Sequence, residues 1–270
     1  MKTFYYRDFS DNFVETKNQT KSVPENYRFI KQNPFLKLAG AILFLILKLV
    51  ASVYGKFWLG LKIEGKEKLR TYVKSTKKGY YLYANHTLTL GDVFNPALYN
   101  PVHPYYVCDS SNLGIPILGP ILPLVGALPI PDSIRGKKRL FDAISTRAKQ
   151  KKAIVIYPEA HLWPYYTDIR PFDSTAFSFP VRDDLPVFTA TTTFHAWKGH
   201  KKPRITIFID GPFYAKTDAS TNSAPTSSLS ERALQKVKAS SLHDQALSAL
   251  KKRAASSTIK YINYKKREEN

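Results

Sequence analysis

Six short apolar segments alternate with helical patterns along this chain, and this alternation most constrains what it can fold into. The segments lie near residues 80, 105, 127, 154, 188 and 206. Residues 133–152 and two runs between residues 230 and 253 show the helical spacing of apolar side chains. Strands that alternate with helices are typical of an α/β domain. We therefore predict an α/β fold with a mixed sheet flanked by helices.

One of these strands delivers a histidine and an acid into a turn. Residues 79–84 read as a buried strand, and Asn85, His86, Gly91 and Asp92 follow it. In open α/β sheets, ligands bind at the carboxyl ends of the strands. His86 and Asp92 are therefore a candidate general base and its orienting carboxylate. The alternative is that Asp92 caps a helix beginning at Val93 and that His86 is an ordinary polar residue of the turn.

Two further strand ends make the pattern more specific. The strand at residues 153–157 ends in Pro158 and Glu159, and a third apolar segment, residues 185–190, follows a Pro-containing turn. In this order, over roughly residues 60–215, the segments resemble the glycerolipid acyltransferase family, the enzymes similar to 1-acylglycerol-3-phosphate acyltransferase. That family carries Asn-His-(four residues)-Asp, then Phe-Pro-Glu-Gly-Thr-Arg, then a Val-Pro-Val-like block.

The resemblance implies an O-acyltransferase of phospholipid biosynthesis. Such an enzyme moves a fatty acyl group to the hydroxyl of a lysophospholipid, most commonly 1-acylglycerol-3-phosphate. The donor is a thioester of acyl carrier protein or coenzyme A, or an acyl phosphate. His86 and Asp92 are then the predicted catalytic pair, and Asn85 and Glu159 are predicted to bind substrate. For Glu159 a salt bridge with a nearby Lys or Arg is the alternative.

The chain departs from the family pattern at two places. Five residues separate His86 from Asp92 where the family has four, and we expect Gly91 to absorb the extra residue through backbone angles closed to other residues. Ala160, His161 and Leu162 stand where the family has Gly-Thr-Arg. The family arginine that binds the acceptor phosphate is therefore missing from its place, and we predict that Arg135 or Arg170 supplies it from a loop.

The sequence implies neither a metal nor a cofactor. No two of the six histidines have the spacing of a metal site built on one helix, and the single cysteine, Cys108, is predicted to be a packing residue. Gly-rich phosphate loops of the Walker or dinucleotide type do not occur, so ATP and NAD are not implied.

The N-terminal region predicts a membrane contact and sets the predicted domain boundaries. Residues 1–34 are a polar segment, residues 35–62 an apolar membrane-associating helical element, and residues 63–270 the acyltransferase domain with its C-terminal helices. Lys37, Lys48 and Lys56 fall on one side of a helix opposite Leu, Ile and Phe residues. We favour a helix lying in the membrane interface, with a spanning helix or a hairpin packed on the enzyme's own core as alternatives.

The charge of the chain indicates a polyanionic partner. It has 41 Lys and Arg against 21 Asp and Glu, a formal net charge of +20. Because the chain has an apolar N-terminal run and no recognised nucleic-acid motif, we predict an anionic membrane surface and no nucleic acid. The predicted location is the cytoplasmic face of the cell membrane, as a peripheral or monotopic protein. A catalytically silent lipid- or acyl-binding protein of the same fold is the alternative function.

Overall fold

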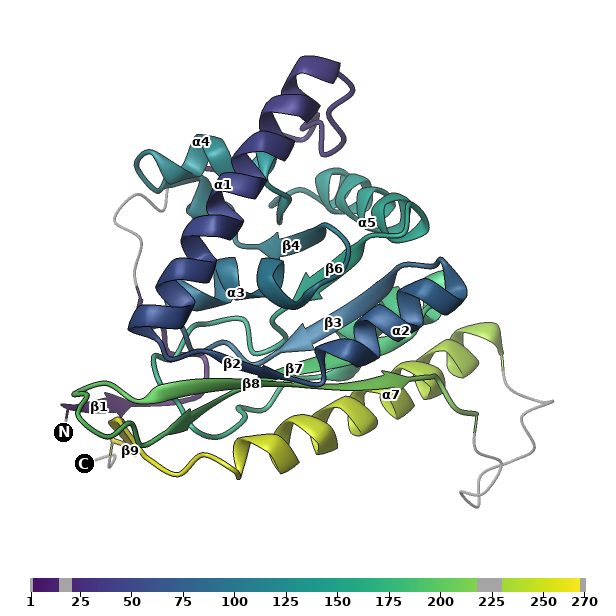
Figure 1. Ribbon diagram of the computed structural model, residues 1–270. Helices are drawn as coiled ribbons and strands as arrows, with labels where there is room; N and C mark the ends of the chain where they lie inside the picture. The colour runs from purple at the N-terminus through teal and green to yellow at the C-terminus, as the bar shows by residue number, and fades with distance from the viewer. Residues whose placement is uncertain (1, 15–20, 218–229, 268–270) are drawn as a thin grey trace.

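A seven-stranded sheet forms the centre of the computed structural model, which describes residues 2–14, 21–217 and 230–267 (Figure 1). The strand order is β2-β8-β7-β3-β6-β4-β5. The bounds are β2 Lys62–Glu64, β3 Tyr80–Ala84, β4 Pro104–Cys108, β5 Ala127–Pro129, β6 Ala153–Ile156, β7 Val187–His195 and β8 Arg204–Phe213. Strands β3 to β7 are parallel, β8 runs antiparallel to β7, and β2 is parallel to β8. The predicted mixed sheet is confirmed.

Helices cover both faces of this sheet, which explains why its central strand is apolar throughout. Every side chain of β3 is buried, and alternate residues enter two different cores. Tyr80 and Leu82 pack against α2 (Lys66–Thr76) and α3 (Gly91–Tyr99). Tyr81 and Tyr83 face α5 (Ile134–Lys149), α6 (Ser178–Asp183) and α7 (Glu231–Ala254). A parallel sheet buried on both faces requires such continuous apolar strands.

The sequence marks the beginnings of the longer helices with capping side chains. Ser133 Oγ accepts a hydrogen bond from Gly136 N at 3.0 Å before α5, and Ser230 Oγ accepts one from Ala233 N at 3.3 Å before α7. The two helical runs predicted after residue 230 form one continuous helix, α7. Shorter elements complete the chain: η1 Ser110–Gly114, α4 Leu118–Ile121, η2 Leu122–Leu124 and η3 Ser174–Phe177.

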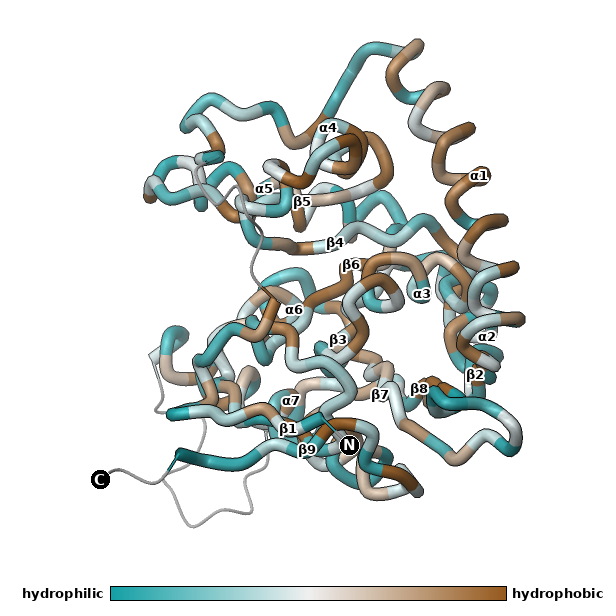
Figure 2. The backbone as a smooth tube through the Cα atoms, turned by 90° about the vertical axis from the view of Figure 1, so that its left-hand side faces the viewer, coloured by the Kyte–Doolittle hydropathy of each residue, from teal (hydrophilic) through white to brown (hydrophobic). Residues whose placement is uncertain are grey.

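The N-terminal apolar segment forms a single long helix, α1 (Pro34–Trp58). Asn33 caps it and Pro34 occupies its first position. The helix packs on α3 and η2 through small residues, and a Cβ at Gly40 would lie 2.6 Å from Leu124 O. Figure 2 shows its largely hydrophobic course along one side of the molecule. The large apolar side chains left exposed on it are Phe35, Leu36, Leu38, Ile42, Leu45, Ile46, Leu49, Val50, Val53, Phe57 and Trp58.

A second, two-stranded sheet joins the two ends of the described chain. β1 (Lys2–Tyr6) pairs in parallel with β9 (Ile262–Lys266), with Lys2 opposite Ile262. Together with residues 7–14, these strands form what we call the terminal clasp. Its aromatic side chains surround Trp163, which is fully buried: Tyr6, Phe9, Phe13 and Tyr264 have ring centroids 4.9 to 5.9 Å from that indole. This sheet was not predicted from the sequence.

Asp210 on β8 connects helices that lie on opposite faces of the sheet. Its carboxylate accepts hydrogen bonds from Lys68 Nζ of α2 at 2.8 Å and from Arg253 Nε of α7 at 2.7 Å. The hydrogen bond from Arg253, followed by that from Lys68, lowers the pKa of Asp210 below its ordinary value of 3.8. The ionised form therefore stabilises the fold at neutral pH.

We expect Asp210→Asn to lower the free energy of unfolding at pH 7 by about 1.5 to 3 kcal/mol, the value of hydrogen bonds to a charged group. Because the folded-state pKa is lowered, this stabilisation is complete above the unfolded pKa and is lost as the pH falls through the folded one. Urea unfolding between pH 7 and pH 3 measures both effects. The variant should show a smaller loss of stability toward acid than the wild type. An Asp132→Asn control, at an exposed position, should match the wild type, and an equal acid dependence in Asp210→Asn would contradict the assignment.

Candidate active site

The predicted site residues follow two adjacent parallel strands, so the chain leaves both strands at the same edge of the sheet. Tyr83 of β3 lies opposite Ile156 of β6, and Ala84 lies opposite Ala190 of β7. Beyond the end of β3, the buried Asn85 side chain accepts a hydrogen bond from Thr192 N at 2.8 Å and donates one to Thr192 O at 3.0 Å. Asn85 therefore extends the pairing of β3 with β7 by one residue and directs His86 outward.

His86 and Asp92 meet at this edge. His86 Nδ1 lies 2.8 Å from Asp92 Oδ2, and the same oxygen accepts hydrogen bonds from Thr87 N at 2.7 Å and Leu88 N at 2.8 Å. An ionised carboxylate can only accept hydrogen bonds, so the proton belongs on Nδ1 and the lone pair on Nε2. The imidazole is 21% exposed and the carboxylate 4% exposed. This arrangement can present a basic nitrogen to a ligand.

The extra residue between His86 and Asp92 is absorbed by the turn, but not in the way the sequence suggested. Gly91 has no left-handed backbone angle and begins α3. A Cβ there would lie 2.7 Å from Leu88 Cδ1, so glycine permits a close approach. Asp92 N donates to Leu88 O at 3.0 Å, and the turn winds around the carboxylate. The capping alternative is also wrong, because Leu90 is the N-cap and Asp92 lies inside the first turn.

Tyr157, which was not among the predicted site residues, packs directly on this pair. Its ring stacks on the His86 imidazole, with centroids 4.5 Å apart and planes inclined by 25°. Its hydroxyl donates a hydrogen bond to the backbone carbonyl of Asp92. Burial, followed by the nearby Asp92 charge, raises the pKa of Tyr157 well above its ordinary value, so the hydroxyl keeps its proton. Its place two residues before Glu159 was the available clue.

Glu159 and Arg170 form a buried ion pair beside His86. Arg170 Nη2 lies 3.2 Å from Glu159 Oε2, and both side chains are almost fully buried. Glu159 also accepts hydrogen bonds from His86 N at 3.2 Å and Arg170 N at 3.0 Å. Burial raises the pKa of Glu159 and lowers that of Arg170, and their mutual attraction opposes both changes. The salt bridge left open for Glu159 is thus observed, and substrate binding by either residue stays a prediction.

The loop that follows Glu159 holds the backbone of His86 from its other side. Trp163 N donates to His86 O at 3.1 Å, and Tyr165 N donates to Thr87 O at 2.9 Å. The terminal clasp in turn holds this loop: Trp163 Nε1 donates to Asp11 O at 2.8 Å and Arg170 Nη1 to Phe9 O at 3.2 Å. The N-terminal residues therefore support the histidine through two layers of contacts.

Two other positions considered in the sequence, Ala160 and Arg135, are not part of the His86–Asp92 pair. Ala160, where the family has glycine, adopts a left-handed φ of 62°, which costs an L-residue about 1 kcal/mol. Arg135 lies on an exposed first turn of α5 and pairs with Glu25 at 3.5 Å. No hydrogen bond or ion pair joins it to His86 or Glu159 among the described residues.

The described residues include no group of three or more His, Cys, Asp or Glu side chains placed to hold a metal ion. Cys108 lies at the end of β4, where burial, followed by the charge of Asp109, raises the pKa of its thiol to about 12. A thiol that stays protonated is a poor nucleophile.

A double-mutant cycle tests the Glu159–Arg170 pair independently of any activity. Arg170→Met leaves a buried carboxylate without its partner and should lower the free energy of unfolding by about 3 to 5 kcal/mol, and Glu159→Gln should cost a similar amount. The double variant should cost clearly less than the sum of the two. Arg135→Ala, which removes an exposed pair, is the control and should change stability by less than about 0.5 kcal/mol. Additive losses in denaturant unfolding would show that the two residues do not interact.

Comparisons with known proteins identify the fold. No protein-family model matches the chain, and no curated protein matches it. The crystal structure of the 1-acyl-sn-glycerophosphate (LPA) acyltransferase PlsC from Thermotoga maritima is similar, with a TM-score of 0.54 and 14% sequence identity, over 86% of this chain and 87% of that one. The chain therefore has the fold of a glycerolipid acyltransferase, as its Asn-His and Tyr-Pro-Glu segments implied.

Proposed function

We propose that this protein is an O-acyltransferase of glycerolipid metabolism. It moves a fatty acyl group from a thioester or acyl phosphate to the hydroxyl of a lysophospholipid, with 1-acylglycerol-3-phosphate as the first acceptor to test. The observation that carries the proposal is the 2.8 Å contact between His86 Nδ1 and Asp92 Oδ2. The contact forms in spite of the additional residue in the turn, at the edge of an α/β sheet where ligands bind. The shared fold with PlsC supports the same reaction class.

The proposed mechanism is general base and general acid catalysis without a covalent enzyme intermediate. His86 Nε2 accepts the proton of the acceptor hydroxyl while that oxygen attacks the acyl carbonyl carbon. The tetrahedral intermediate then collapses, the bond from carbon to the donor sulfur or phosphate oxygen breaks, and the imidazolium returns a proton to the leaving group. Asp92 holds the imidazole in one tautomer and stabilises its charged form.

The proposed substrate-binding residues divide by their surroundings. The side chains of Asn85, Glu159 and Arg170 already bond to protein groups, so we propose that they serve the substrate by placing His86. Arg135 is exposed and its pair with Glu25 is weak in this setting. It is therefore the better candidate to contact an acceptor phosphate.

We further propose that the protein works on the cytoplasmic face of the cell membrane as a peripheral or monotopic protein. α1 is long and apolar enough to cross a bilayer by length and composition. Its packed side lies on the domain, and its other side exposes a continuous row of large apolar residues. A helix with this pattern fits the membrane interface, and the net charge of +20 favours anionic lipids. In this division residues 35–62 associate with the membrane and residues 63–270 form the catalytic domain.

The second candidate is a catalytically silent lipid- or acyl-binding protein of the same fold. The absence of Gly-Thr-Arg after Glu159 favours it, because Ala160, His161 and Leu162 supply no guanidinium there. Only the acyltransferase turns over substrate, so an assay of acyl transfer by the purified protein distinguishes the two candidates.

We expect the wild type to transfer acyl groups to a lysophospholipid in detergent, and His86→Ala to lower the rate by about 10² to 10⁴, the usual contribution of a general base. Asp92→Asn should also lower the rate, because the amide no longer holds the His86 imidazole in the tautomer with its proton on Nδ1. His200→Ala is the control, since that histidine is exposed in the turn between β7 and β8. Equal activity in His86→Ala would contradict the mechanism. Acyl binding without turnover, for every donor and acceptor tried, would favour the silent protein.

Tyr157→Phe tests whether the hydroxyl on Asp92 positions the catalytic pair. We expect kcat to fall by about tenfold and KM to stay nearly constant, because small displacements of catalytic groups are costly whereas substrate contacts persist. Tyr83→Phe is the matched control: it also removes a hydroxyl bonded to a backbone carbonyl, that of Ala176, on the other face of the sheet. Equal losses of kcat in both variants would assign the effect to general stability.

A further inference from the structure

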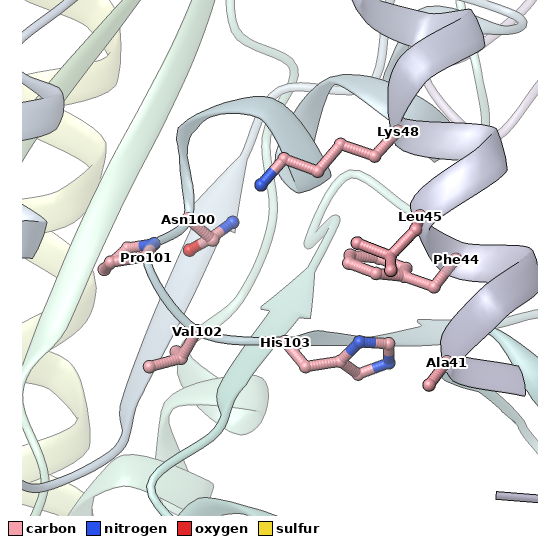
Figure 3. A pocket seen from close by; sticks show the side chains of 8 residues that line it. All are labelled: Ala41, Phe44, Leu45, Lys48, Asn100, Pro101, Val102 and His103. Atoms are coloured by element: carbon pink, nitrogen blue, oxygen red, sulfur yellow. The ribbon is translucent and has the colours of Figure 1, made fainter. Parts of the chain in front are cut away.

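A groove of about 290 Å³ lies between α1 and the turn that leads from α3 to β4 (Figure 3). Most of its wall is apolar, and its residues come from these two segments: Ala41, Phe44, Leu45, Lys48, Asn100, Pro101, Val102 and His103. Two of the lining rings, Phe44 and His103, pack together with centroids 4.2 Å apart. The groove is not part of the site described above.

The groove opens at the edge of the sheet opposite to His86. α3 begins just after the catalytic pair and runs for nine residues before it ends at Tyr99, a length of about 13 Å. His103 follows that helix, precedes β4, and accepts a backbone hydrogen bond from Ala153 N at the start of β6. A ligand in this groove therefore lies at the amino ends of the strands, about the length of α3 from the reacting centre.

Lys48 supplies a half-buried cation at the groove. It was predicted to share one helix face with Lys37 and Lys56, and its side chain extends toward Asn100 on the domain side of α1 (Figure 3). Neither α1 nor residues 100–108 contain an acidic residue. Among the described residues, no carboxylate pairs with Lys48. A lysine that lacks a carboxylate partner beside an apolar wall is suited to an anionic, amphiphilic ligand.

The surroundings of His103 add positive charge to this end of the sheet. Burial, followed by the charges of Lys152 and Arg147, lowers the pKa of His103 to about 4. Arg147 stacks on the Tyr105 ring at 4.6 Å, and its Nε is buried without a hydrogen-bond partner. No ion pair with a described carboxylate neutralises Arg147 or Lys152. The electrostatic potential around the groove therefore favours an anion.

We propose that this groove binds an anionic phospholipid of the bilayer, with the headgroup phosphate at Lys48 and one acyl chain along Phe44, Leu45 and Val102. Continuity with the membrane-facing side of α1 argues for a bilayer lipid, because Leu45 both lines the groove and is 65% exposed on that side. The bound lipid is not the reacting one, because the groove lies at the other edge of the sheet. The inference rests on the proposed membrane association of α1 but does not depend on acyl transfer.

A tryptophan in place of Leu45 provides the test. Full-length Leu45→Trp is mixed with phosphatidylcholine vesicles that contain, at equal mole fraction, either brominated phosphatidylglycerol or brominated phosphatidylcholine. Quenching of the added tryptophan, measured against the protein with its three native tryptophans, should reach half its maximum at about fivefold less brominated phosphatidylglycerol. That ratio is on the order expected for one lysine and an anionic lipid.

Two variants in the Leu45→Trp background locate the preference. Lys48→Ala should abolish the fivefold difference, and Lys37→Ala, which removes the same charge from the same helix outside the groove, should retain it. Lys48→Met keeps an apolar stem and is read in place of the alanine variant if that one does not fold. Equal quenching by both lipids, or a preference that survives the loss of Lys48, overturns the proposal. Absence of quenching by either lipid overturns the membrane association as well, whereas failure of the acyltransferase assay leaves a positive result intact.

Discussion

The buried carboxylate of Glu159 organises the candidate site. A charge removed from water is tolerated only when it is paired and hydrogen-bonded, and here it meets the Arg170 guanidinium and the backbone amides of His86 and Arg170. His86 follows the end of β3, and Arg170 lies in the loop after β6, eleven residues beyond Glu159. Satisfying one carboxylate therefore brings the histidine and that loop to fixed positions, and the loop returns a hydrogen bond from Trp163 N to His86 O.

The Asp92 carboxylate fixes the position of the His86 imidazole in the same way. One of its oxygens accepts from Nδ1 of His86 and from two amides of the turn, so the same charge shapes the backbone and selects the tautomer. α3 then carries the chain from this edge of the sheet to the other, where basic residues that form no ion pair with a described carboxylate lie near an apolar groove. The two edges therefore differ in chemistry: Asp92 and the Glu159–Arg170 pair lie at one, and Lys48 lies beside an apolar groove at the other.

Much of this architecture follows from the sequence, because a strand buried on both faces must be apolar throughout. The segments at β3, β6 and β7 have that property, and residues 133–152 have the spacing of the helix observed as α5. Contacts between segments far apart in the chain, such as the pairing of β1 with β9, have no such pattern in the sequence. The sequence left Arg170 and Arg135 as equal candidates for the missing arginine. Arg170 is buried against Trp163 and Phe9, and Phe9 is far away in sequence. The angle expected of Gly91 was wrong because close packing, not a left-handed turn, requires glycine there.

The terminal clasp has a consequence for the order of events during synthesis. β1 leaves the ribosome about 260 residues before its partner β9 is made. Until then Phe4 and Phe13 lack their contacts with Tyr264, and Trp163 lacks the Tyr264 ring that stacks on it. A nascent chain with a complete seven-stranded sheet and an exposed apolar α1 therefore exists before its His86 is fully supported. The proposed association of α1 with lipid and the completion of the candidate site are then separate steps, and the pairing of β1 with β9 is the later one.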